Sequence, residues 1–226
     1  MPIVFRPAAE RGRLVDPGLS GTAAFSHGSA FDRDWLGFHA LRVLNRVELA
    51  PGARLPAARR ANMELLTLVL SGTYRATSAA GDSGPVVTGG AYRLGAGAGV
   101  DLVEENPDPA VASRLVQLWV APTHSNARPA HAVAHVDGPG PIAGPASAPL
   151  PWSAAASVRR EGIAPGAMRA LPTTSTSACW IEVLDGELAL GGRILRRGDG
   201  VGIAGEPALA LVSSFGADVL VVDLPA

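Results

Sequence analysis

The sequence has no lysine, a single cysteine and few aromatic residues, and each shortage excludes a class of chemistry. All 19 basic residues are arginine, so the chain has neither a lysine for Schiff-base chemistry nor the lysine of a phosphate-binding loop. The lone Cys179 excludes an intrachain disulfide and a zinc site built from several cysteines. It lies in the apolar run SACWIEVL, which predicts a buried and unreactive thiol.

Net charge and long apolar segments are also missing. The formal net charge is -1, so no overall field attracts nucleic acid or anionic lipid, and we expect neither partner. The first residues, MPIVFRPAAERGR, lack the apolar stretch of a signal peptide, and no segment approaches the length of a membrane span. These observations predict a soluble, cytoplasmic protein.

What the sequence does contain is a series of short strand signals. Val, Leu and Ile dominate five segments bounded by turn residues, at 41–49, 63–72, 113–122, 178–190 and 218–224. The 27 glycines and 19 prolines suit many turns between strands. Only PWSAAASVRREGI (151–163) allows a turn or two of helix. The pattern predicts an all-β sandwich or barrel.

A Pro/Gly-rich stretch divides the chain. VDGPGPIAGPASAPLP (136–151) has one charge and predicts a linker at 137–150 between domains at 1–136 and 151–226. The same order of a Pro-Gly turn, a strand ending in glycine and a glycine-rich turn occurs on both sides, from VELAPGARLPA and from REGIAPGAMRALP. This weak internal repeat predicts two β-barrels, the second of them shorter.

Several segments of the first half resemble the cupin superfamily and, within it, the pirin family of bicupins. ARRANMELLT (58–67) lies without gaps over a pirin stretch like HPHRDMEIIT, and AGAGVDLVEEN (96–106) matches a motif like AGRGVRHSEFN. LVQLWVAP (115–122) resembles the pirin strand that ends in Gln-x-Trp, and LGFHALRVLN (36–45) the approach to the first barrel. The resemblance implies a bicupin, two tandem jelly-roll-type barrels, and it is weaker over 150–226.

Pirins are thought to hold an iron or similar metal with three histidines and one glutamate. The resemblance places these positions at Ala58, Arg60, Leu102 and Glu104, so the metal-ligand histidines are missing and only the glutamate remains. Ala and Leu have no donor atom and arginine is a permanent cation. We therefore expect no metal cofactor, although the family norm is Fe or another divalent metal.

Arg60 offers a substitute for the lost cation. We expect its guanidinium to pair with Glu104, Glu64 or both inside the first barrel, because an unpaired buried carboxylate is costly. The alternative is that Arg60 points to solvent and Glu64 caps a turn. The predicted ligand pocket consists of five residues, namely Arg60, Glu64, Glu104, Gln117 and Trp119. We expect an anionic or phenolic small-molecule ligand there.

Three functions remain open at this point. The favoured one is a non-catalytic small-molecule-binding or regulatory protein that has lost its metal site, with no catalytic residues. The second, implied by the resemblance, is a metal-dependent dioxygenase of the quercetinase type. The third is a protein-interaction partner in transcriptional regulation, a role that eukaryotic pirins are thought to have. The sequence does not indicate which protein this partner would be.

Other candidate residues give weaker signals. His131 and His135 are four residues apart, a spacing that serves a metal on a helix, but their context is typical of a loop. His27 and His39 are isolated and are interpreted as structural or surface residues. The glycine-rich segment 95–100 lacks the lysine and the following helix of a phosphate-binding loop.

Overall fold

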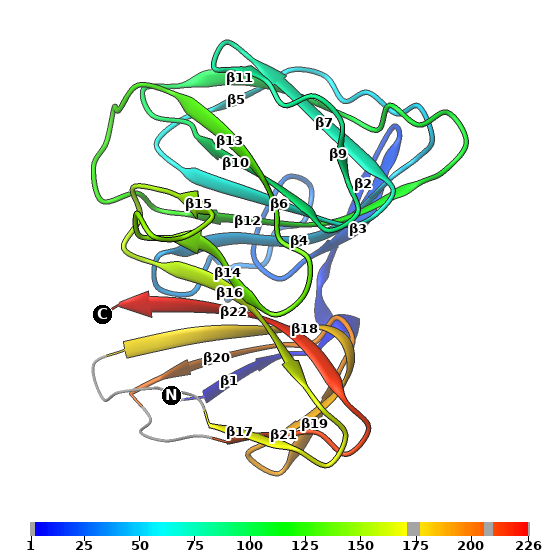
Figure 1. The fold of residues 1–226 in the computed structure, drawn as a ribbon, viewed down its shortest axis with the longest axis vertical. Coiled ribbons are helices and arrows are strands. Elements are labelled where there is room, and N and C mark those ends of the chain that lie inside the picture. The colour runs from blue at the N-terminus through cyan, green and yellow to red at the C-terminus, as the bar shows by residue number, and fades with distance from the viewer. Residues whose placement is uncertain (1–2, 171–176, 206–209, 226) are drawn as a thin grey trace.

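The computed structural model describes residues 3–170, 177–205 and 210–225 (Figure 1). Apart from one 3₁₀ turn at Ala8–Glu10, the regular structure within these residues is β, which confirms the predicted class. The helical turn considered within 151–163 is wrong, since this segment carries the strand β16 (Ser157–Ile163). β16 is hydrogen-bonded between β14 and β22, and this pairing outweighs the helix propensity of the alanine run. No described helix is long and apolar enough to cross a membrane.

The strands in the described part of the chain form three sheets. The seven-stranded sheet contains β2 (Gly12–Asp16), β3 (Leu19–Ala23), β4 (Leu41–Leu49), β6 (Glu64–Ser71), β10 (Gly90–Gly95), β12 (Ser113–Val120) and β13 (Ala130–His135). The five-stranded sheet contains β5 (Ala58–Arg60), β7 (Thr73–Ser78), β8 (Gly81–Asp82), β9 (Val86–Val87) and β11 (Val100–Glu105). The ten-stranded sheet contains β1 (Ile3–Arg6), β14 (Gly140–Gly144), β15 (Leu150–Pro151), β16, β17 (Met168–Ala170), β18 (Ser177–Leu190), β19 (Arg193–Arg196), β20 (Gly200–Ala204), β21 (Ala210–Val212) and β22 (Ala217–Pro225).

The seven-stranded sheet is the middle layer of the molecule. It packs against the five-stranded sheet on one face and against the ten-stranded sheet on the other (Figure 1). Its strands are therefore apolar on both faces, which is why β6 has the nearly continuous apolar sequence ELLTLVLS. Leu65 and Val69 belong to the core of the first barrel, whereas Leu66 and Leu68 pack toward the second barrel. This alternation decides which side chains can reach a cavity inside the first barrel.

The segment between the barrels is not an irregular linker. Within the predicted linker 137–150, β14 pairs with β16 and becomes part of the ten-stranded sheet. Proline and glycine are tolerated there because β14 has a register shift between Pro141 and Ala143. The predicted first domain also contributes a strand to the second, since β1 pairs with β20. The boundary read from composition therefore does not separate two self-contained units.

A buried ion pair joins the two barrels. Arg11 donates from Nη1 and Nη2 to the two carboxylate oxygens of Glu182, at 2.9 and 2.7 Å, and both side chains are 0% exposed. Arg46 lies 3.7 Å from the same carboxylate and donates to the carbonyl oxygen of Val183. Burial and the neighbouring arginines lower the pKa of Arg46, and Glu182 partly offsets this. Bidentate pairing of this kind satisfies both charges and fixes one relative position of the barrels.

Cys179 lies in the core of the second barrel. Its side chain belongs to the apolar cluster inside that barrel, and burial raises the pKa of the thiol to about 12. The predicted burial of the thiol is confirmed, and a raised pKa disfavours the reactive thiolate.

Candidate functional site

The antiparallel pairing of β5 with β11 builds one wall of a cavity in the first barrel. Arg60 lies opposite Val100 and Ala58 opposite Leu102, and side chains directly opposite each other share a face of the sheet. Leu102 belongs to the core inside the first barrel, so Ala58, Arg60 and Glu104 also face the interior. The structure therefore brings the four positions that the pirin resemblance identified onto one face.

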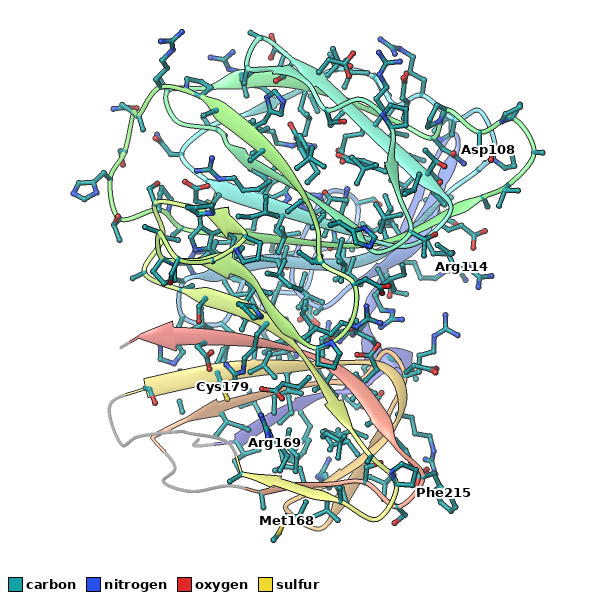
Figure 2. All side chains as sticks on the ribbon, in the orientation of Figure 1. Asp108, Arg114, Met168, Arg169, Cys179 and Phe215 are labelled. Carbon is teal, nitrogen blue, oxygen red and sulfur yellow. The ribbon has the colours of Figure 1, made fainter. Side chains whose placement is uncertain are left out.

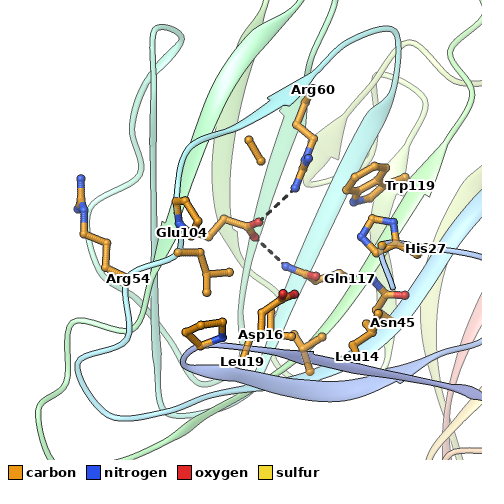
Figure 3. Close-up of a pocket in the computed structure, with 16 residues that line it drawn as sticks. Leu14, Asp16, Leu19, His27, Asn45, Arg54, Arg60, Glu104, Gln117 and Trp119 are labelled. Carbon is orange, nitrogen blue, oxygen red and sulfur yellow. Dashed lines mark hydrogen bonds and ion pairs between the residues drawn. The ribbon is translucent and has the colours of Figure 1, made fainter. Parts of the chain in front are cut away.

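The strand β12 supplies the opposite wall. Val116 and Leu118 pack toward the second barrel, so the alternate residues Gln117 and Trp119 point into the first barrel. The cavity between the walls measures about 380 Å³ and is shown in Figure 3. Its remaining lining is mostly apolar and comes from Leu14, Asp16, Pro17, Leu19, His27, Gly28, Asn45, Val47, Arg54, Leu55 and Pro56.

Glu104 is the buried carboxylate of this cavity. Its Oε1 accepts hydrogen bonds from the Tyr74 hydroxyl at 2.9 Å and from Gln117 Nε2 at 2.7 Å. Burial raises the pKa of Glu104, and the hydrogen bond from Tyr74, the charge of Arg60 and the hydrogen bond from Gln117 offset this in part. Burial and the charge of Glu104 also raise the pKa of Tyr74 well above its ordinary value. Tyr74 is therefore a neutral hydrogen-bond donor at neutral pH.

Arg60 is held loosely in the cavity. Its Nη2 lies 4.0 Å from Oε2 of Glu104, and its Cζ lies 4.7 Å from the ring centroid of Trp119, within the range of a cation–π contact. Nη1 donates to the carbonyl of Arg59 at 3.3 Å. The buried Nε has no hydrogen-bond partner in the described part of the chain. The expected pairing with Glu104 is present, but as a long ion pair that leaves donors of the guanidinium unused (Figure 3).

Glu64 does not line this cavity, so the predicted pocket is wrong at this residue. Of the alternatives expected for Arg60, the described residues show the pair with Glu104 and not the pair with Glu64. The side chain follows the even-numbered residues of β6 toward the second barrel, where it is 3% exposed. There Arg93 Nε donates to Oε2 at 3.0 Å, and the backbone nitrogen and hydroxyl of Ser153 donate to Oε1 at 3.1 and 2.6 Å. Glu64 therefore connects the two barrels.

His27 and Asn45 line the cavity, and sequence reasoning missed both. The ring of His27 meets that of Trp119 edge-on, with centroids 4.8 Å apart. Burial, and then the charge of Arg60, lower the pKa of His27, so its imidazole is neutral at neutral pH. Asn45 is 1% exposed, and its Oδ1 has no partner among the described residues. The signal for Asn45 is a polar residue within the apolar strand LRVLNRVEL.

The other histidine candidates do not form a metal site. His131 and His135 lie on β13, where a rise of about 3.3 Å per residue separates them by about 13 Å. His131 Nδ1 contacts the carbonyl of Ala80 at 2.9 Å, and its ring stacks on Tyr92. His39 has a φ of 51° and its ring contacts Phe38. His39 is exposed, in agreement with its interpretation as a structural or surface residue, whereas His27 lines the cavity.

The donor set of the cavity is poor in metal ligands. The four positions aligned with the pirin ligands contain one carboxylate and no imidazole, and a guanidinium lies 4.0 Å from that carboxylate. In residues 3–170, 177–205 and 210–225 no three His, Cys, Asp or Glu side chains are grouped so that they could hold a metal ion. Imidazole donors supply much of the affinity for ions such as nickel or iron, so these residues do not fit the family's metal.

Two β-barrels in tandem define the bicupin class of proteins. The Pirin family model matches residues 5–120, and the family model described as quercetinase C-terminal cupin domain matches residues 154–224. The chain belongs to the pirin family.

Relatives of similar length support this assignment. The chain is 26% identical to "Quercetin 2,3-dioxygenase" of Escherichia coli strain K12, covering 99% of both proteins. It superposes on the crystal structure of the bacterial pirin YhhW from Escherichia coli in complex with nickel(II) with a TM-score of 0.93, at 26% identity and 99% coverage of both chains. A pirin-like protein of Caulobacter vibrioides is 33% identical over 43% of this chain and 42% of its own length.

Proposed function

We propose that this protein is a pirin-family bicupin whose first barrel binds an anionic or phenolic small molecule without a metal. The carrying observation is Arg60: a fixed cation occupies a position at which the family resemblance places a metal-ligand histidine, 4.0 Å from Glu104. A guanidinium there supplies positive charge to Glu104 and repels a metal cation.

The cavity has the composition of a ligand site. Its volume of about 380 Å³ falls in the range of about 300–1,000 Å³ that small-molecule pockets occupy. Apolar side chains dominate the walls, and a few polar groups converge from Arg60, Glu104 and Gln117. The Nη groups of Arg60 suit a carboxylate or phenolate of the ligand, because a charged acceptor strengthens such hydrogen bonds. Trp119 and the apolar walls suit its carbon skeleton.

Elemental analysis of the purified protein tests the metal-free part of the proposal. We expect nickel, iron, copper and manganese far below one atom per chain, even after incubation with nickel(II) followed by desalting. A metal retained in a one-to-one ratio by the wild-type protein and lost in Glu104→Gln contradicts the proposal.

Isothermal titration with salicylate and quercetin tests the ligand. Both carry phenol groups and salicylate adds a carboxylate, so we expect saturable binding of at least one of them. Arg60→Gln should weaken that binding by about 10- to 100-fold, the equivalent of about 1.5–3 kcal/mol for a hydrogen bond to a charged group. The matched control is Arg59→Gln, because Arg59 is an exposed neighbour paired with Asp101. Equal affinities in the two variants, or binding of neither compound, contradict the proposal.

A metal-dependent quercetinase is the second candidate, and a specific observation favours it. The relative named "Quercetin 2,3-dioxygenase" aligns with 99% of this chain, and the related pirin YhhW was solved with nickel(II). Oxygen uptake in the presence of quercetin and added nickel(II) or iron(II) tests this function. Turnover that a chelator removes and that Glu104→Gln abolishes supports the dioxygenase over the binding protein.

A further inference from the structure

A groove of about 340 Å³ lies where the two barrels meet, away from the cavity of the first barrel. Its floor is the face of the seven-stranded sheet that packs toward the second barrel. Thr22 and Arg46 are cross-strand partners there, as are Ser20 and Glu48, and Arg114 lies on the other side of Glu48. Directly opposed side chains share a face. The apolar interface between the barrels therefore ends in a polar, arginine-rich edge.

Three guanidinium groups and one carboxylate line this groove. Arg46 and Arg114 come from the first barrel, and Arg197 comes from the turn after β19 in the second. Arg114 projects from the edge of the molecule near the junction of the barrels (Figure 2). Arg197 is exposed and makes no ion pair with any residue that the structure describes. Its charge is close enough to contribute to the lowered pKa of Arg46.

The carboxylates near the groove do not balance this charge. Glu182 lies behind Arg46 and already accepts two hydrogen bonds from Arg11. Glu48 accepts from Nε of Arg114 at 3.1 Å, which leaves both Nη groups of Arg114 without a hydrogen-bond partner among the described residues. Asp199 accepts from the backbone nitrogens of Ala8 and Arg196. The whole chain carries a net charge of -1, so the positive excess is local to this groove.

We propose that the groove between the barrels binds the phosphoryl group of a small phosphorylated molecule. The planar forks of Arg114 and Arg197 approach it from the two barrels, and arginine forks match the spacing of phosphate oxygens. The hydroxyls of Ser20 and Thr22 lie on the same face and supply neutral donors. The groove is larger than an inorganic phosphate ion needs, which leaves room for an organic substituent.

Calorimetric titration of the full chain with inorganic phosphate tests this site, with sodium chloride at matched ionic strength as the reference. We expect saturable binding of phosphate, with Arg197→Gln and Arg114→Gln each weakening it about tenfold, as the loss of one charge-assisted hydrogen bond predicts. Both side chains are exposed, so the variants should keep the thermal unfolding midpoint of the wild type. Titration of glycerol 3-phosphate then shows whether an organic substituent adds affinity.

Two control variants make the result specific. Arg196→Gln removes the same charge from the adjacent residue, whose side chain is 70% exposed and does not line the groove, and it should change phosphate affinity less than about twofold. Arg60→Gln tests instead whether the phosphate binds in the cavity of the first barrel, which binding in the groove does not require. Equal losses in Arg196→Gln and Arg197→Gln indicate a general charge effect, and loss in Arg60→Gln places the anion in the first barrel. Either result, or no binding beyond that of chloride, overturns the proposal.

Discussion

Two arginine–glutamate pairs of this protein share their chemistry and differ in geometry. Between the barrels, Arg11 meets Glu182 through two hydrogen bonds of 2.9 and 2.7 Å, with both side chains 0% exposed. Inside the first barrel, Arg60 stays 4.0 Å from Glu104, and the carboxylate takes its hydrogen bonds from Tyr74 and Gln117 instead. The first pair is out of reach of a ligand because both side chains are fully buried, although Nε of Arg11 has no partner among the described residues, whereas the second leaves both an arginine and a carboxylate oxygen available beside the cavity.

This difference in geometry shows that a buried arginine–glutamate pair can either stabilise the fold or take part in ligand binding. A fully buried pair joined by two direct hydrogen bonds resists separation, because the loss of either partner would leave the charge of the other uncompensated. In a long ion pair beside a cavity, either residue can replace its partner by a ligand at a small cost in free energy, because little direct contact is lost. We therefore interpret Arg11–Glu182 as a structural pair and Arg60–Glu104 as an adaptable one.

Breaking the structural pair should have the largest effect. Arg11→Met leaves Glu182 buried with only the more distant Arg46, and it should lower the free energy of unfolding by about 3–5 kcal/mol. Urea denaturation followed by circular dichroism measures this change. Arg13→Met, at an exposed position of β2 two residues after Arg11, serves as the control. A loss below about 1 kcal/mol in Arg11→Met means that the pair does not fix the barrels together.

Restoring imidazoles at the cavity should have the next largest effect. Because β5 and β11 hold positions 58, 60 and 102 on one face with Glu104, the triple variant Ala58→His, Arg60→His, Leu102→His should gain nickel affinity by more than about 100-fold. The loss of a residue that only hydrogen-bonds to a metal ligand already lowers metal affinity by up to about 100-fold. Competition against a chromophoric chelator measures the affinity. A variant that folds but binds nickel no better than the wild type shows that the frame no longer fits a metal.

The raised pKa of Glu104 predicts a pH-dependent effect of smaller size. The pKa lies above the unperturbed value of 4.5 in the folded protein, so the unfolded chain releases this proton first as the pH rises. The stability that Glu104 contributes is present below pH 4.5 and is lost as the pH rises to its folded-state pKa. Glu104→Gln should therefore gain stability relative to the wild type between pH 4 and pH 7. Urea unfolding at both values measures the difference; an unchanged or opposite difference contradicts a raised pKa.

Removing the adaptable pair should have the smallest effect on stability. Arg60→Gln should change the free energy of unfolding by less than about 1 kcal/mol, because the ion pair is long and Glu104 keeps both hydrogen bonds to Oε1. The same urea experiment as for Arg11→Met measures it. A loss comparable to that of Arg11→Met erases the distinction between the two pairs.

Much of the fold could be predicted because its strands are buried on both faces and punctuated by glycine. Gly72, for example, has a φ of 82° and lies directly between β6 and β7, as the turn at the end of a strand requires. The strand within the Pro/Gly-rich segment 137–150 was missed, because its pairing with β16 is a tertiary contact that local composition does not encode.

The cavity could be predicted only in part. Gln117 and Trp119 follow from alternation along one strand, and Arg60 and Glu104 from the motif. Glu64 was misplaced because the turn at Asn62, with a φ of 50°, separates β5 from β6, and alternation cannot be counted through such a turn. His27 was missed because it lies outside the named strands, in a bridge with Ala30, and meets Trp119 only through the tertiary fold.

The pairing of β1 with β20 has a practical consequence for anyone who dissects this protein. A fragment ending near residue 136 would carry away a strand that completes the other half, exposing the unpaired edge of β20 to intermolecular association. We expect each excised barrel to aggregate. We also expect a bulky fusion placed directly before Ile3 to disturb the second barrel before the first, because β1 pairs there with β20.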